Sequence, residues 1–107
     1  MKVKVYISGP YSQGNTNENT YHAIVVGEAI ADMGASPFIP HLSHFRPRTR
    51  SYEYWIQEDL EWLSCCQALY RMPGESPGAD REVEYANESG IPVFYSLNEL
   101  EEFINKV

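Results

Sequence analysis

The sequence has few positive charges, only two cysteines and no long apolar run. Eight lysines and arginines stand against 15 aspartates and glutamates, so the formal net charge is −7. Nucleic acid polymers and anionic membrane surfaces are bound through a basic face, and this charge balance disfavours both as partners. A small anionic ligand held by backbone amides remains compatible with it.

All apolar stretches are far shorter than the roughly 20 residues that a membrane-spanning helix requires. The N-terminus enters a strand-like pattern at once, without the charged and apolar regions of a signal peptide. We therefore expect no membrane partner and a cytoplasmic location.

Cysteine and histidine are too sparse to predict a metal site. Cys65 and Cys66 are adjacent, a spacing that does not suit tetrahedral zinc, so we expect both to be buried reduced thiols. His41 and His44 lie in one loop without an evident third ligand, which favours loop packing or substrate contact over metal binding. No metal or organic cofactor is predicted.

A chain of 107 residues has room for one domain, assigned here to residues 1–107. Strand-like patterns cover residues 2–8, 36–40, 68–72 and 91–95. Helix-like patterns follow each of them, over residues 20–33, 52–63, 77–89 and 97–107. This alternation predicts an α/β fold: a flavodoxin-like or Rossmann-like three-layer sandwich with a parallel sheet of four to five strands.

Ligands of such folds bind at the carboxyl ends of the strands, which makes residues 9–19 and 73–79 the expected walls of a site. The second loop contains Gly74 and Ser76 and leads into a helix that carries Glu82 in its first two turns. Free amides and the helix dipole at this turn favour an anion, and they would help to keep the Glu82 carboxylate ionised.

An ionised carboxylate directed at a sugar carbon is what glycosyl transfer requires of its nucleophile. Acidic first turns are also common in α/β proteins that have no catalytic role there. The acids around Asp59 fit a solvated helix surface equally well. The pattern alone leaves a structural and a catalytic interpretation open for both Glu82 and Asp59.

Five segments in order resemble the nucleoside 2-deoxyribosyltransferase-like superfamily, including its short DUF4406-type members, which are similar to 2′-deoxynucleoside 5′-phosphate N-hydrolases. These segments are Val5–Tyr11, Asn19 with Ala23, Asp59–Leu63, Ser76–Ala79 ahead of Glu82, and Gly90–Val93. The resemblance covers most of the chain. It implies cleavage of the N-glycosidic bond of a (deoxy)nucleoside 5′-monophosphate, with water as the acceptor and no cofactor.

The same resemblance implies roles for single residues. Glu82 would be the nucleophile that forms a covalent glycosyl-enzyme intermediate, Asp59 the second acid, and Tyr6 the tyrosine that orients Glu82. Ser76 matches the serine that holds the 5′-phosphate in relatives acting on nucleoside monophosphates, where transferases of free nucleosides tend to have aspartate. The residues expected to contact the substrate are Ser8, Gly9, Pro10, Tyr11, Ser12, Ser76, Gly78 and Ala79.

Two positions depart from the family pattern. Gln67 stands where relatives commonly have an aspartate near the presumed site, and Ser12 stands where the nucleotide hydrolases have an arginine. Phosphate would then depend on amides, hydroxyls and an arginine among Arg46, Arg48 and Arg50. Tyr11 and Trp55 would either enclose the base or pack in the core.

Three alternatives remain: a deoxyribosyltransferase that exchanges bases, a nucleotide-binding module without turnover, and an unrelated flavodoxin-like signalling domain. The last would usually carry an acidic cluster after the first strand, where this chain has Ser8-Gly9-Pro10, and a flavin carrier would have more Ser and Thr there. Relatives assemble as dimers or larger oligomers, and so small a chain encloses a pocket poorly, so we expect a homo-oligomer.

Overall fold

The computed structural model describes residues 2–107, and in it one parallel sheet carries the fold. Its strands have the order β2-β1-β3-β4 and run over β1 (Lys4–Ser8), β2 (Ser36–Phe38), β3 (Ala68–Arg71) and β4 (Val93–Phe94). The helices are α1 (Thr16–Asp32), the 3-10 helix η1 (Pro40–Phe45), α2 (Tyr52–Leu63), α3 (Pro77–Ser89) and α4 (Leu97–Lys106). The predicted α/β sandwich with a four-stranded parallel sheet is confirmed.

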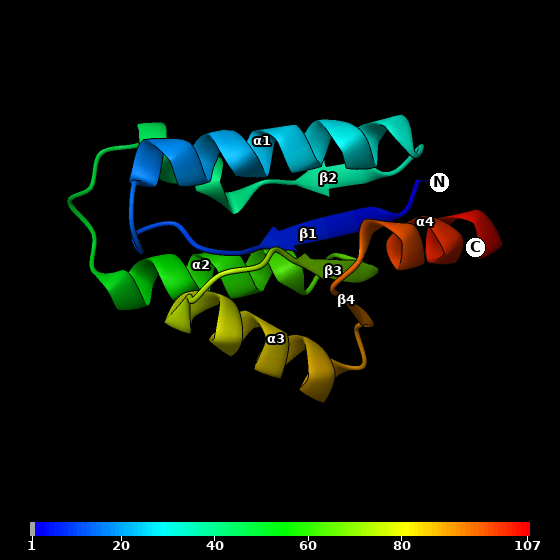
Figure 1. The fold of residues 1–107 in the computed structure, drawn as a ribbon. Helices are drawn as coiled ribbons and strands as arrows, with labels where there is room; N and C mark the ends of the chain where they lie inside the picture. Colours follow the sequence, from blue (N-terminus) through cyan, green and yellow to red (C-terminus); the bar gives the residue numbers. More distant parts are fainter. Residues whose placement is uncertain (1) are drawn as a thin grey trace.

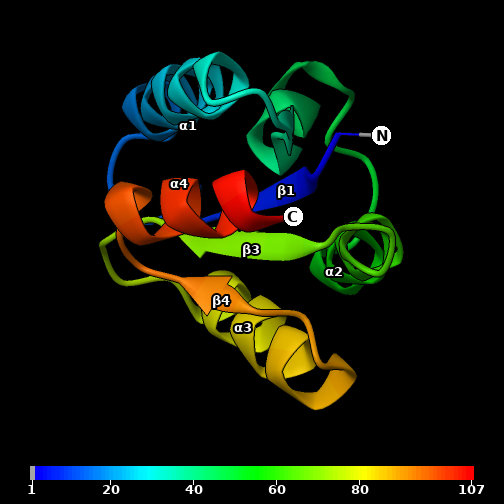
Figure 2. The same ribbon diagram turned by 90° about the vertical axis from the view of Figure 1, so that its right-hand side faces the viewer.

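Helices cover both faces of the sheet, as Figures 1 and 2 show: α1 and α4 lie on one face, α2 and α3 on the other. Successive side chains of a strand point to opposite faces. Val5 and Ile7 therefore enter the core beside α1 and α4, whereas Tyr6 packs in the core on the side of α3. Ser8 shares the face of Tyr6, so the end of β1 presents two hydroxyls to α3.

Hydrogen-bonding side chains fix where the helices begin. Asn15, Ser51, Ser76 and Ser96 each accept a hydrogen bond from the backbone N–H three residues later. Helix α3 ends at Gly90, which adopts the left-handed conformation with φ of +76°. These caps account for the close agreement between the predicted and observed bounds of α2, α3 and α4, whereas α1 begins at Thr16, inside the stretch 9–19 that was predicted as loop, because Asn15 caps it.

Three other local predictions were wrong. The stretch 91–95 is not a buried strand: only Val93–Phe94 pairs, and both residues are half-buried because β4 is an edge strand bonded to β3 alone. The predicted loop before α2 contains η1. Cys66 is buried as expected, but Cys65 is exposed beyond the end of α2.

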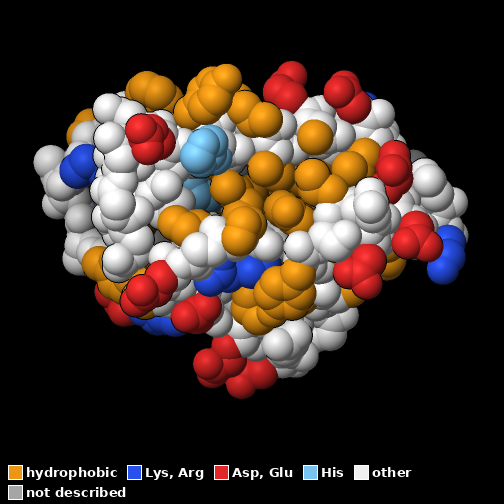
Figure 3. Space-filling model, in the orientation of Figure 1, with side chains coloured by type: hydrophobic (Ala, Val, Ile, Leu, Met, Phe, Trp, Pro, Cys, Tyr) orange, Lys and Arg blue, Asp and Glu red, His pale blue; other side chains and the backbone are white. Residues whose placement is uncertain are grey.

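Hydrophobic side chains gather in the centre of the face seen in Figure 3, between α1 and α4, with acidic side chains around them. Tyr21 and Val25 of α1 are also well exposed. The expected homo-oligomer stays a prediction. Within residues 2–107, no helix combines the length and apolar character needed to cross a membrane.

Candidate active site

A cavity of about 580 Å³ opens at the carboxyl ends of β1 and β3, where α2 and α3 begin. Figure 1 shows these strand ends and helix starts on its left side. It lies at the switch in strand order, the usual ligand position in open α/β sheets. The predicted site residues that line it are Gly9, Tyr11, Ser12, Asp59, Ser76, Gly78, Ala79 and Glu82. The two walls expected from the sequence therefore meet at one cavity.

Glu82 reaches this cavity from the second turn of α3, and its side chain is almost fully buried. The phenol of Tyr6 donates a hydrogen bond of 2.7 Å to Oε2, and the hydroxyl of Ser8 donates one of 2.7 Å to Oε1. Burial raises the pKa of Glu82, while these two hydroxyls and the charge of Arg71 act to lower it. The carboxylate is thus oriented and stabilised by hydroxyls.

The sequence had suggested that free amides at the start of α3 would keep Glu82 ionised. In the structure the Ala79 amide donates to Ser76 Oγ at 3.1 Å, and among the described residues the donors to the Glu82 carboxylate are the Tyr6 and Ser8 hydroxyls. The net pKa shift is upward because burial outweighs the hydroxyls. Ser8, expected to contact substrate, is fully buried behind Glu82 and holds it instead.

Asp59 lines the same cavity from α2. Burial, the charge of Glu82 and the charge of Glu58 raise the pKa of Asp59 to about 8, against the opposing charges of Arg48 and Arg46. Asp59 is therefore protonated at neutral pH and can donate a proton. The pKa values of both carboxyl groups are raised, but Glu82 accepts two hydroxyl hydrogen bonds that favour its ionised form, and such different environments are typical of acid and nucleophile pairs.

Tyr6 lies behind Glu82 and does not line the cavity itself. Burial and the charges of Glu82 and Asp59 raise the pKa of Tyr6 well above its usual range, so the phenol keeps its proton. Its ring stacks on Phe38 with centroids 5.6 Å apart, and Phe38 stacks on Trp62 at 5.5 Å. This stack fixes the direction in which the Tyr6 hydroxyl points.

Arginine and aromatic side chains form another wall of the cavity. The Arg48 guanidinium lies 4.3 Å from the ring centroid of Trp55 and 5.3 Å from that of Tyr11, and all three residues line the cavity. Arg50 also lines it, whereas Arg46 is paired with Glu58 at 2.5 Å outside it. Arg48 and Arg50 are therefore the arginines placed to meet an anion.

Both loop histidines hold the cavity wall. His41 is buried and its Nε2–H donates to the Pro10 carbonyl at 3.0 Å, while the expected contact of Pro10 with substrate stays a prediction. Burial lowers the pKa of His41. His44 Nδ1 is 2.8 Å from the Tyr11 hydroxyl. Among residues 2–107, no group of three His, Cys, Asp or Glu side chains could hold a metal ion.

Gln67 lies away from the cavity. It sits just before β3, at the opposite end of the sheet, and its Oε1 accepts a hydrogen bond of 2.8 Å from the Lys4 amide. The missing aspartate at this position therefore does not remove a carboxylate from the site.

Several cavity residues were not identified as site residues from the sequence. Gln13 comes from the loop before α1, Pro40 and Ser43 from η1, and Tyr52 and Ile56 from α2. The segment that contains η1 carries no apolar period, so only its length between two elements signalled a functional loop.

Comparison with known proteins adds a family and a shared fold. Residues 3–96 match the family described as "Domain of unknown function (DUF7768)", which differs from the DUF4406 type that the sequence had suggested. No curated protein matches the chain.

Solved structures do resemble it. One is a 2-deoxyribosyltransferase from the psychrotolerant bacterium Bacillus psychrosaccharolyticus, characterised as a biocatalyst for nucleoside synthesis. Its sequence is 20% identical, and the two structures superpose with a TM-score of 0.68 over 85% of this chain and 69% of that one. Another is a conserved protein from Enterococcus faecalis V583, which is also 20% identical. It superposes with a TM-score of 0.67 over 87% of this chain and 62% of that one. At this identity the likeness shows a common fold.

Proposed function

The chain belongs to the DUF7768 family, and from its site we propose that it cleaves the N-glycosidic bond of a (deoxy)nucleoside 5′-monophosphate. Glu82 would form a covalent glycosyl-enzyme intermediate and water would be the acceptor. One observation carries the proposal: a carboxylate fixed by two hydroxyls shares a cavity with Asp59, whose pKa of about 8 keeps it protonated. A two-step displacement at a sugar carbon requires a protonated acid beside an ionised nucleophile, and the two hydroxyls and the charge of Arg71 favour the ionised form of Glu82.

In the first step a Glu82 oxygen attacks the anomeric carbon C1′. The bond between that oxygen and C1′ forms, and the bond from C1′ to the base nitrogen breaks. Its electron pair stays on the base, which takes the proton of Asp59 as it leaves. Asp59 becomes a carboxylate and the sugar phosphate remains attached to Glu82.

In the second step a water oxygen attacks C1′ and gives its proton to the Asp59 carboxylate. The bond between C1′ and Glu82 breaks, and its electron pair returns to Glu82, where the Tyr6 and Ser8 hydroxyls stabilise the recovered charge. Both carboxyl groups are thereby restored. A second base in place of water would give base exchange, the alternative supported by the fold shared with a 2-deoxyribosyltransferase.

The remaining walls suit the two ends of a nucleotide. Ser76 caps α3, whose N-terminus favours an anion, and Arg48 and Arg50 add positive charge to a cavity in an acidic protein. Tyr11 and Trp55 offer aromatic faces that can enclose a base.

The test is chromatography of ribo- and deoxyribonucleosides and their 5′-monophosphates, incubated with wild type and with Glu82→Gln, with and without a second free base. Base release by wild type alone supports the proposal, and exchange onto the added base moves it to transferase. With a substrate whose base leaves without protonation, intact-protein mass after acid quenching of Asp59→Asn should show an adduct of one sugar phosphate, because the second step still lacks its base. No release across the whole panel would contradict the enzyme and favour a binding module without turnover.

A further inference from the structure

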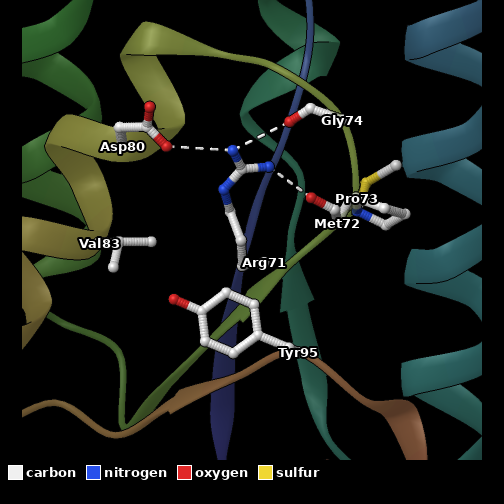
Figure 4. Close-up of a pocket in the computed structure, with 7 residues that line it drawn as sticks. All are labelled: Arg71, Met72, Pro73, Gly74, Asp80, Val83 and Tyr95. Atoms are coloured by element: carbon white, nitrogen blue, oxygen red, sulfur yellow. Dashed lines mark hydrogen bonds and ion pairs between the residues drawn. The ribbon is translucent and has the colours of Figure 1, made fainter.

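Arg71 ends β3 and points its guanidinium into the turn that follows, as Figure 4 shows. Nη1 donates to the Met72 carbonyl, and Nη2 donates to the Gly74 carbonyl at 3.0 Å and to Asp80 Oδ1 at 3.2 Å. The side chain is only 11% exposed, whereas its partner Asp80 is 72% exposed. A nearly buried guanidinium thus donates its hydrogen bonds to the turn between β3 and α3 and to the first turn of α3. This turn is the second wall of the active-site cavity.

This turn packs closely against the first wall. A Cβ built on Gly74, whose φ is +116°, would lie 2.8 Å from Pro10 Cγ. A Cβ built on Gly9 would lie 2.8 Å from Met72 Cβ. With so little space between the two walls, a shift of the turn that Arg71 holds would be transmitted to the loop after β1.

Arg71 also stands beside the groups that hold the nucleophile. It pairs with Ser8 in the register of β1 and β3, and paired residues of parallel strands present their side chains to the same face. The groups that face Glu82 are Tyr6 and Ser8 from β1, Asp59 from α2 and Arg71 from β3. Of these four residues, Arg71 is the one that carries a permanent positive charge, which favours the ionised form of Glu82.

We propose that Arg71 is a positioning residue of this site, which fixes the turn over residues 73–76 and with it the start of α3, so that Glu82 meets the Tyr6 and Ser8 hydroxyls. Its charge additionally favours the ionised form of Glu82. The three contacts of Arg71 with Met72, Gly74 and Asp80 are called the clamp. That the clamp serves catalysis rests on the proposed function, but the clamp itself can be tested without turnover.

The test compares wild type with Arg71→Lys, Arg71→Met and a matched control, Arg81→Met. Arg81 lies on α3 beside Glu82 and is also an ion-paired arginine, but its guanidinium bonds Glu53 at 2.9 Å and so joins α3 to α2. Lysine keeps the charge but lacks the planar fork whose two nitrogens reach the Met72, Gly74 and Asp80 acceptors, whereas methionine removes both the charge and the bonds. Amide hydrogen exchange of the segment Ala79–Asp80, whose N–H groups donate to Ser76 at the end of this turn, reports the clamp, and NMR titration of the Glu82 carboxyl reports the charge.

We expect exchange in this segment to become at least about tenfold faster in both Arg71 variants and to stay unchanged in the control. The pKa of Glu82 should rise in Arg71→Met and rise less in Arg71→Lys. If both Arg71 variants exchange at the same rate as wild type, the proposed clamp is refuted. If Arg71→Met fails to fold by circular dichroism, Arg71→Lys decides the outcome.

Catalysis is tested separately on the same variants. If wild type releases base, both Arg71 variants should lose kcat with KM little changed, and the acidic limb of the pH profile should move upward in Arg71→Met. A wild type that releases no base would refute the proposed function, while the exchange and titration results would still decide the role of Arg71.

Discussion

The Tyr6 phenol oxygen lies 2.7 Å from Oε2 of Glu82, although the two residues are 76 positions apart in the chain. Tyr6 comes from the middle of β1 and Glu82 from α3, which packs on the same face of the sheet. Ser8 Oγ binds the other carboxylate oxygen at 2.7 Å. With a donor on each oxygen, the carboxylate has one orientation, and its remaining lone pairs can be directed at a substrate.

Tyr6→Phe should lower kcat by roughly 10- to 100-fold, because a hydrogen bond to a charged group is lost while the stack on Phe38 remains. The phenol lowers the pKa of Glu82, so its removal should shift the acidic limb of the rate profile to higher pH. Base release measured across pH tests both effects. Tyr70→Phe, on the α1 and α4 face, is the control; equal losses in the two variants would argue against an orienting role for Tyr6.

Glu82→Gln should lower kcat by at least about 1,000-fold, because an amide oxygen is a poor nucleophile. Stability should hold, since the variant removes a buried charge and the hydroxyls of Tyr6 and Ser8 can rotate to accept from the amide. Urea unfolding should therefore give a midpoint no lower than wild type. Glu84→Gln, exposed on the same helix, should change neither quantity. Retained activity in Glu82→Gln would remove Glu82 from the mechanism.

Much of this arrangement could be predicted from the sequence. Strand and helix periods locate the elements, and the rule that parallel sheets bind ligands at their carboxyl ends brings the loops after β1 and β3 together. Asp59 and Glu82 fall at one cavity as a consequence. The role of Ser8 was also within reach, because it lies two residues after Tyr6 and must share its face of the sheet.

Other features depend on contacts that leave no mark in the sequence. Arg71 bonds mainly to backbone carbonyls, which every residue possesses, so no pattern of residue types reveals the clamp. Helix η1 has no apolar period, and the length of β4 depends on its position at the sheet edge. The upward shift of the Asp59 pKa requires knowing that its carboxyl is buried near Glu82.

Asp59 should act as an acid only while protonated, so kcat should fall as pH rises through about 8, the pKa of Asp59. Asp59→Asn should lower kcat and abolish this basic limb. Substrates whose bases leave without protonation should be affected least. Glu61→Gln, exposed on α2, serves as the control. A basic limb that persists in Asp59→Asn would assign it to another group.

The same pKa predicts how stability depends on pH. The folded-state pKa of Asp59 is about 8, above the ordinary value of 3.8, so its contribution to stability is complete below 3.8 and is lost as pH rises through 8. Wild type should be less stable at pH 9 than at pH 6. Asp59→Asn should recover on the order of 1–3 kcal/mol of unfolding free energy at pH 9. Urea midpoints at the two pH values test this; an unchanged difference in the variant would show that Asp59 is ionised without cost.

Ser76→Asp should separate phosphate recognition from helix capping. Aspartate caps a helix as well as serine does, so α3 and the stability of the fold should persist, but its charge would oppose a phosphate at the same place. The ratio of kcat/KM for a 5′-monophosphate to that for its nucleoside should fall by roughly 100-fold. Ser96→Asp, at the cap of α4 outside the cavity, should leave the ratio unchanged. An unaltered ratio in Ser76→Asp would instead place the phosphate at Arg48 and Arg50, which also line the cavity. Arg50→Gln should then reduce the ratio.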